Sequence, residues 1–132
     1  MQDVGCPDTT IDSLDAARAL LGRLLARAEA ERLYVAHLRR DGRLIRLRVR
    51  NAAMGRQIDF PLRTIVTDAL NLGSAALILA HNHPSGDPTP SSADIDATRS
   101  LIRAARPLGI AVSDHLVFAG ESFVSFRQRG LL

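Results

Sequence analysis

The spacing of apolar residues changes several times along the chain, and each change predicts a different element of secondary structure. In residues 11–29, apolar side chains recur at intervals of three and four, which predicts an amphipathic helix. Residues 33–38 and 44–50 alternate instead with a period of two, which is typical of strands. The Asp41-Gly42 pair between these two segments favours a tight turn, so we expect a β-hairpin.

The second half of the chain predicts two more helices and further strands. Residues 62–72 and 92–106 each carry an apolar stripe with helical spacing, and a glycine or proline follows each of them. Between them, residues 75–80 form a continuous apolar run, as expected for a strand that is covered on both faces. Other strands are expected at residues 110–118 and 122–126, and a short one could form at residues 57–60.

This order of helix, hairpin, helix, strand, helix and strands predicts one α/β (α+β) domain with a mixed β-sheet flanked by helices. The chain has 132 residues, of which 46% are hydrophobic and 23% are charged, so it can bury one ordinary core. We expect the folded domain at residues 13–132 and a flexible N-terminal segment at residues 1–12.

The sequence also limits where the protein acts. Its single cysteine, Cys6, excludes a disulfide within one chain and a zinc cluster of several cysteines. The longest apolar run, residues 75–80, is too short to cross a bilayer. The first residues lack the basic start and the apolar core of a secretory signal. We therefore expect a cytoplasmic protein without a membrane partner.

Residues 81–94 contain the ligand types of a hydrolytic zinc site. His81 and His83 follow the apolar run, and residues i and i+2 of an extended strand point to the same side. Asp94 lies in the first turn of the expected helix, behind a loop that Pro88 and Pro90 stiffen. Two imidazole nitrogens and one carboxylate fill three tetrahedral positions of Zn²⁺ and leave the fourth to water, whose pKa the ion lowers to about 7. We expect one zinc ion per chain.

Hydrolysis at such a site also needs a general base and a group that stabilises an oxyanion. Of the three glutamates, Glu31 stands at the start of the first strand, where the sheet could aim it at the metal. Glu29, at the end of the first helix, is the alternative base, and Glu121 lies in a turn. Ser91 stands three residues before Asp94, and its hydroxyl could donate a hydrogen bond to the oxyanion.

Several of these residues also have a simpler interpretation. Ser91 and Asp94 are spaced nearly as a capping box, which stabilises a helix without any metal. Asp87 is expected to be a turn residue. The Asp114-His115 pair could orient a metal ligand or could simply belong to a strand, and both interpretations stay open. His37 is not expected to bind the metal.

The pattern His81-x-His83-Pro84, six residues, Ser91-x-x-Asp94 resembles the JAMM motif of the MPN+/JAB metalloproteases. The run from His81 to Pro90, together with Asp114-His115-Leu116, resembles the RadC-like branch of that family. This resemblance extends from about residue 13 to the C-terminus. Members of this branch commonly carry a helix-hairpin-helix region before the domain, and these 132 residues contain none.

The resemblance implies the JAB/MPN-like, cytidine-deaminase-like fold, in which helices flank a mixed sheet and one zinc ion is bound. It implies that His81, His83 and Asp94 are the zinc ligands and that Ser91 stabilises the oxyanion. It also implies a glutamate as the base, and Glu31 is assigned to that role by its position alone.

A basic segment suggests a different kind of partner. All 17 basic residues are arginine, and six of them lie between Arg39 and Arg50. This arginine strip could face the phosphates of a nucleic acid or an acidic partner, or it could be the solvated face of the hairpin.

Three functions therefore compete. The first is a zinc metallopeptidase or isopeptidase, an enzyme whose peptide or isopeptide substrate the sequence does not identify. The second is a DNA-repair-associated protein of the RadC type that binds nucleic acid or acts as a nuclease. The third is a JAB-like scaffold or interaction module that leaves its metal site unused. In each case the chain could form a homo-oligomer.

Overall fold

From the first helix onward, strands and helices follow one another in the predicted order, and a short strand that was not predicted precedes them. The structure is a computed structural model, and it describes residues 3–4, 9–26, 28, 30–50 and 60–132. Its elements are β1 (Asp3–Val4), α1 (Leu14–Leu25), β2 (Leu33–Leu38), β3 (Leu44–Val49), α2 (Leu62–Leu72), β4 (Ala76–Asn82), α3 (Ser92–Ala105), the 3₁₀ turn η1 (Arg106–Leu108), β5 (Ala111–Ala119) and β6 (Ser122–Ser125).

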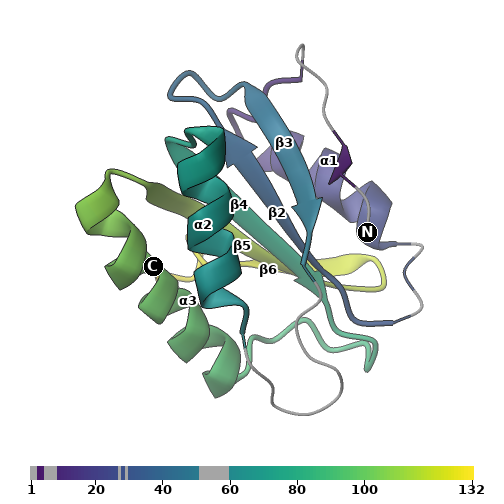
Figure 1. The fold of residues 1–132 in the computed structure, drawn as a ribbon. Helices are drawn as coiled ribbons and strands as arrows, with labels where there is room; N and C mark the ends of the chain where they lie inside the picture. The colour runs from purple at the N-terminus through teal and green to yellow at the C-terminus, as the bar shows by residue number, and fades with distance from the viewer. Residues whose placement is uncertain (1–2, 5–8, 27, 29, 51–59) are drawn as a thin grey trace.

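The strands form a mixed sheet in the order β1-β3-β2-β4-β5-β6. The helix α1 covers one face of this sheet, and α2 and α3 lie side by side on the other (Figure 1). The predicted hairpin is formed by β2 and β3, which pair antiparallel. The predicted fold class, α/β (α+β) with a mixed sheet flanked by helices, is therefore confirmed.

β4 lies in the middle of the sheet and delivers the chain to the candidate site. It runs antiparallel to β2 and parallel to β5, so His81 pairs with Leu33 on one side and with Val117 on the other. A parallel pair needs a long crossover connection, which α3 provides. The strand extends beyond the predicted residues 75–80 as far as Asn82, because β5 still pairs with that residue.

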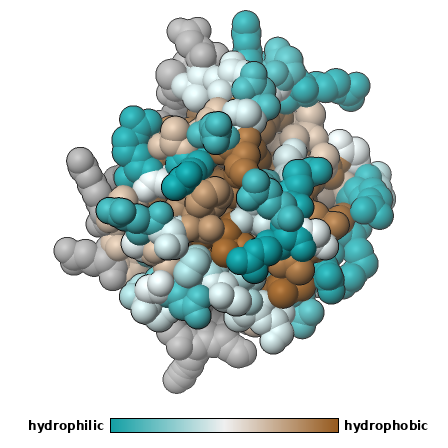
Figure 2. All heavy atoms as spheres, turned by 180° about the vertical axis from the view of Figure 1, so that it is seen from behind, coloured by the Kyte–Doolittle hydropathy of each residue, from teal (hydrophilic) through white to brown (hydrophobic). Residues whose placement is uncertain are grey.

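Alternation along the strands divides the core between the two faces of the sheet. On the α2 and α3 face, Val35 and Leu79 pack beneath Ile65 and Leu101. The α1 face buries a second set of side chains, which includes Leu21, Leu25, Ala36, Leu38, Leu47, Ile78 and Leu116. Seen from the side opposite to Figure 1, hydrophobic surface is visible between hydrophilic side chains (Figure 2). The strands β2, β4 and β5 therefore contribute to both cores, as the continuous apolar run of β4 predicted.

Local interactions define the start of α1 and the end of α2. The Ser13 side chain accepts a hydrogen bond from the Ala16 N–H at the start of α1. Gly73 ends α2 with a φ of 68°, a left-handed conformation in which glycine meets no steric penalty. Among the described residues, no helix is long and apolar enough to span a lipid bilayer.

The packed body begins before residue 13, where the sequence suggested that the domain starts. Ile11 is only 4% exposed, and its N–H donates to the carbonyl of Gly42. Asp3 and Val4 pair with β3. The predicted flexibility of residues 1–12 as a whole stays a prediction. Cys6 and most of the short strand expected at residues 57–60 lie outside the described residues.

The arginine strip is divided between two environments. Arg39, Arg40 and Arg43 are exposed around the hairpin turn. Arg48 and Arg50 instead lie at 3.7 and 2.8 Å from the carboxylate of Asp68 on α2, and all three side chains are largely buried. The interpretation of the strip as one solvated face is therefore wrong for its second half, because α2 packs over this side of β3.

Candidate metal centre

Two histidines meet at the end of β4. His81 is buried in the strand, and the backbone N–H of His83, just beyond it, donates to the carbonyl of Phe118 in β5. This backbone bond keeps the chain extended, so both imidazoles point to the same side of the sheet. Their Nε2 atoms are 3.0 Å apart. The convergence expected from the i and i+2 spacing is thus present in the structure.

Asp94 joins this pair from the first turn of α3. Its Oδ2 lies 3.2 Å from the Nε2 of His83 and 3.5 Å from the Nε2 of His81. Burial by itself raises the pKa of Asp94, but the hydrogen bond and charge of His81 and the bonds from Ser91 outweigh it, so the pKa is lowered below its usual range. The group is therefore a carboxylate at neutral pH.

Ser91 and Asp94 also form a capping box at the start of α3. The N–H of Asp94 donates to the Ser91 Oγ at 3.0 Å, and the N–H of Ser91 donates to the Asp94 Oδ2 at 2.9 Å. The capping interpretation and the ligand interpretation therefore coexist, because one carboxylate serves the helix start and faces the histidines. The Ser91 hydroxyl hydrogen is not used in either cap bond.

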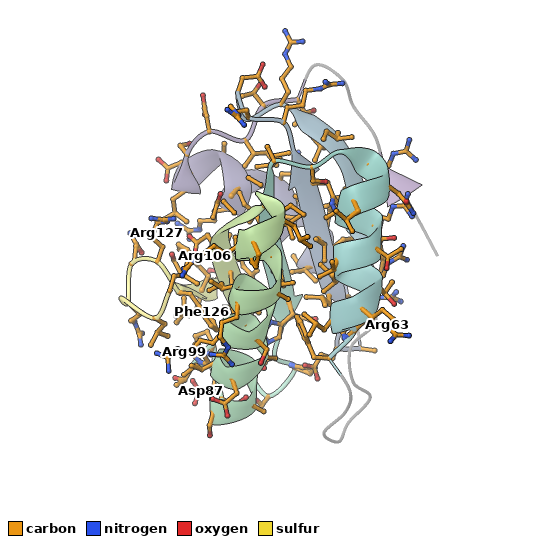
Figure 3. The ribbon with its side chains drawn as sticks, turned by 60° about the vertical axis from the view of Figure 1, so that its left-hand side comes forward. Arg63, Asp87, Arg99, Arg106, Phe126 and Arg127 are labelled. Atoms are coloured by element: carbon orange, nitrogen blue, oxygen red, sulfur yellow. The ribbon has the colours of Figure 1, made fainter. Side chains whose placement is uncertain are left out.

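The loop after the strand fixes the tautomer of His83. Its Nδ1 lies 2.9 Å from the carbonyl oxygen of Asp87, beside the N-terminal end of α3 (Figure 3). A carbonyl can only accept a hydrogen bond, so Nδ1 carries a proton, and in the neutral ring Nε2 presents a lone pair. The carboxylate of Asp87 accepts bonds from the Thr89 backbone and hydroxyl, which lower its pKa and make it a turn residue, as expected.

A buried chain of hydrogen bonds fixes the tautomer of His81. The Thr98 hydroxyl donates to the carbonyl of Asp94 at 2.8 Å, so its oxygen must accept from the Nδ1 of His115, also at 2.8 Å. The Nε2 of His115 is then an acceptor, and it lies 2.8 Å from the Nδ1 of His81. His81 must therefore donate through Nδ1, so in the neutral ring its Nε2 presents a lone pair as well. We call this chain, His81, His115, Thr98 and the Asp94 carbonyl, the histidine relay.

His115 is held neutral for this role. It is 2% exposed and stacks on Phe126 with ring centroids 4.6 Å apart. Burial, and then the neighbouring His81, lower its pKa well below the ordinary value, so it stays uncharged at neutral pH. The two open interpretations of His115 thus merge: it is a strand residue of β5, and it also orients His81.

This arrangement fits a metal ion. When both rings are neutral, two nitrogen lone pairs and one carboxylate oxygen converge, and the two nitrogens repel each other unless a cation or a proton lies between these groups. Two nitrogens bound tetrahedrally to one zinc ion are about 3.3 Å apart, close to the separation that the structure shows. Imidazole and carboxylate are also ligands that zinc accepts.

Glu31 lies close to both histidines. Among the described residues, Glu31, His81 and His83 form a group whose ligand atoms all lie within 4.8 Å of one another. Glu31 stands two residues before Leu33, the partner of His81 in the sheet, and this pairing brings it to the site. It also lines a cavity of about 40 Å³ together with Phe60 and Asp94.

The other candidate residues lie elsewhere or play structural parts. Glu29 lies outside the described residues, and Glu121 is exposed in the turn between β5 and β6. The Nδ1 of His37 lies 2.8 Å from the Ser74 hydroxyl, which agrees with the expectation that it is not a ligand. Sequence reasoning missed the part that Thr98 plays, because its helical spacing indicated only an inward-facing position.

Known proteins resemble this chain over nearly its whole length. A family model described as the RadC-like JAB domain matches residues 11–131. The UPF0758 protein YfjY of Escherichia coli is 39% identical over 120 residues, which are 91% of this chain and 75% of that protein. A UPF0758 protein of Symbiobacterium thermophilum is 53% identical over 70 residues, 53% of this chain and 30% of that protein. A UPF0758 protein of Roseiflexus castenholzii is 55% identical over 67 residues, 51% of this chain and 29% of that protein. The chain thus covers less than a third of these last two relatives.

Proposed function

The chain belongs to the RadC-like JAB domain family, and on this premise we propose that it is a zinc metallopeptidase or isopeptidase, a hydrolase of amide bonds. The observation that carries the proposal is the convergence of two imidazole Nε2 atoms and one carboxylate oxygen. His81, His83 and Asp94 would hold one zinc ion per chain. Three protein ligands with an open fourth position are typical of catalytic zinc sites and not of structural ones.

Two further polar side chains, Glu31 and Ser91, support this proposal. When bound, zinc supplies Lewis acidity and lowers the pKa of a water molecule that it holds. Glu31 takes a proton from the attacking water and passes it to the leaving nitrogen, while the new C–O bond forms and the C–N bond breaks. The Ser91 hydroxyl, whose oxygen accepts the cap bond from the Asp94 N–H, would turn its hydrogen to the oxyanion that develops on the substrate carbonyl.

Metal analysis tests the ligand set. Wild-type protein purified without chelator is expected to hold one zinc ion per chain, and His83→Ala is expected to lose it. Asp94→Asn removes the carboxylate at the site, and Asp96→Asn, an exposed neighbour on the same helix, is the matched control. Equal zinc content in both aspartate variants, or only trace zinc in the wild type, would refute the site.

A second measurement separates an enzyme from a scaffold that merely binds zinc. A panel of peptide and isopeptide substrates is incubated with wild-type protein, Glu31→Gln and the control Glu121→Gln. We expect cleavage by the wild type and by Glu121→Gln, with a loss of roughly 10²–10⁴-fold in Glu31→Gln, the usual contribution of a general base. Equal rates for all three proteins would favour the scaffold and a contaminating activity.

Exposed arginines support nucleic-acid binding as a second candidate function. Arg99 of α3, Arg106 of η1 and Arg127 of the C-terminal segment are exposed and lie on one side of the molecule (Figure 3). Exposed arginines can contact phosphates with little desolvation cost. We place this function second, because it uses none of the groups that converge at the histidine pair.

A further inference from the structure

Asn82 occupies the position between the two histidines that the His-x-His motif leaves unspecified. Its side chain nevertheless makes two specific hydrogen bonds. Asn82 is 7% exposed, and alternation along β4 turns it to the side opposite His81. Its Oδ1 accepts a hydrogen bond from the N–H of Arg32 at 2.8 Å. Its Nδ2 donates to the carbonyl of Ala30 at 3.2 Å. One amide thus holds the two peptide groups that flank Glu31.

The Asn82 side chain continues the hydrogen bonding between β2 and β4 beyond the last backbone pair. The backbone pairing of β2 with β4 ends at Leu33 and His81, so Arg32 would be the next residue in register with Asn82. The carboxamide offers one acceptor and one donor, as a neighbouring peptide group would. Fixing the peptide groups on both sides of Glu31 fixes the direction of its Cα–Cβ bond, and hence where its carboxylate can reach.

We propose that Asn82 is a positioning residue that holds the Glu31 carboxylate against the histidine pair. The inference rests on the proposed function, in which Glu31 is the base. Three consecutive residues of one chain segment then set the geometry: His81 and His83 face the metal, and Asn82 places the base beside them. An asparagine that only satisfied buried peptide groups would leave the environment of the metal unchanged when removed.

Cobalt substitution tests the role of Asn82 without any substrate. Co²⁺ is added to the metal-free forms of the wild type, Asn82→Ala, Glu31→Gln and the double variant, and the visible d–d bands are recorded. Glu31→Gln defines how far the spectrum depends on that carboxylate. We expect Asn82→Ala to move the spectrum toward that of Glu31→Gln, and to cause no further change in the double variant. A spectrum identical to the wild type, or the same shift in both backgrounds, would overturn the proposal.

Hydrogen exchange of the metal-free protein keeps the outcome independent of metal binding. The Arg32 amide is expected to exchange roughly tenfold faster in Asn82→Ala, the effect of losing one hydrogen bond of ordinary strength. Asn82→Asp keeps the acceptor and loses the donor, so its Arg32 amide should stay protected; if Asn82→Ala does not fold, fast exchange of the Arg32 amide in Asn82→Asp overturns the proposal instead. Unchanged exchange of the Arg32 amide in Asn82→Ala overturns the positioning role of Asn82. Failure of the wild type to bind Co²⁺ overturns only the proposed function.

Discussion

Replacing Thr98 by valine removes one hydroxyl from the middle of the histidine relay. We expect this substitution to weaken metal binding by His81, although His115 lies between Thr98 and His81 in the relay. Without the hydroxyl, the Nδ1–H of His115 loses its acceptor. The neutral ring can regain a partner by moving its proton to Nε2 and donating to His81. His81 must then carry its own proton on Nε2, which is the atom that should bind the metal.

The structure sets the size of the effect. Groups that orient a metal-binding histidine typically contribute 10- to 100-fold in metal affinity, or about 1.4–2.7 kcal/mol. Thr98 is fully buried, so loss of its two hydrogen bonds also lowers the free energy of unfolding, by about 1–3 kcal/mol. Valine has nearly the same shape as threonine, so loss of packing adds little.

Competition with a chromophoric chelator measures the zinc affinity, and urea unfolding of the metal-free protein measures stability. Ser125→Ala is the control, because this buried hydroxyl also donates one bond, to Asp114, and accepts one, from Gln128, and neither bond involves a histidine side chain. We expect both variants to lose stability and only Thr98→Val to lose zinc affinity. An unchanged affinity in Thr98→Val, or an equal loss in Ser125→Ala, would refute the relay.

Three other predictions concern Ser91, Asp68 and the exposed arginines. Ser91→Ala removes both the cap and the proposed oxyanion donor, so it should cost about 1 kcal/mol in thermal unfolding and lower kcat, whereas Ser91→Thr should retain both; normal kcat in Ser91→Ala would contradict the catalytic role. Asp68→Asn should destabilise the protein by about 1.5–3 kcal/mol in urea unfolding, because it removes a charged partner of two largely buried guanidinium groups, and an unchanged midpoint would contradict this. If nucleic acid binds at the hairpin turn, Arg39→Ala and Arg43→Ala should each reduce the salt dependence of DNA affinity by about one unit of slope, and slopes equal to the wild type would exclude the turn.

The exposed Arg39 and Arg43 are better probes of nucleic-acid binding than Arg46 and Arg48, although all belong to the strip that the sequence singled out. Arg48 pairs with Asp68, and Arg46 is half-buried on the same side of β3. Substituting either would change stability along with charge. The sequence could not separate the two groups, since period-two alternation gives the face of a strand and does not indicate what packs over that face.

The histidine pair and Asp94 were predictable as neighbours because each lies at a position that local structure fixes. His81 and His83 alternate along a strand, and Asp94 belongs to the first turn of a helix that begins at Ser92. The choice among the glutamates was not fixed in this way. Position favoured Glu31, and the pairing of Leu33 with His81 is what brings this residue within reach of the histidines.

The sequence by itself determined the order of the elements, the mixed character of the sheet and the kinds of ligand at the end of β4, because these follow from periodicity and from spacings of a few residues. Only the tertiary structure decided which nitrogen of each histidine is bare and what Asn82 does. The relay bond between His81 and His115 joins residues 34 positions apart, and the bond between Arg32 and Asn82 joins residues 50 positions apart. Such bonds depend on which strands lie side by side, and no local pattern records that pairing.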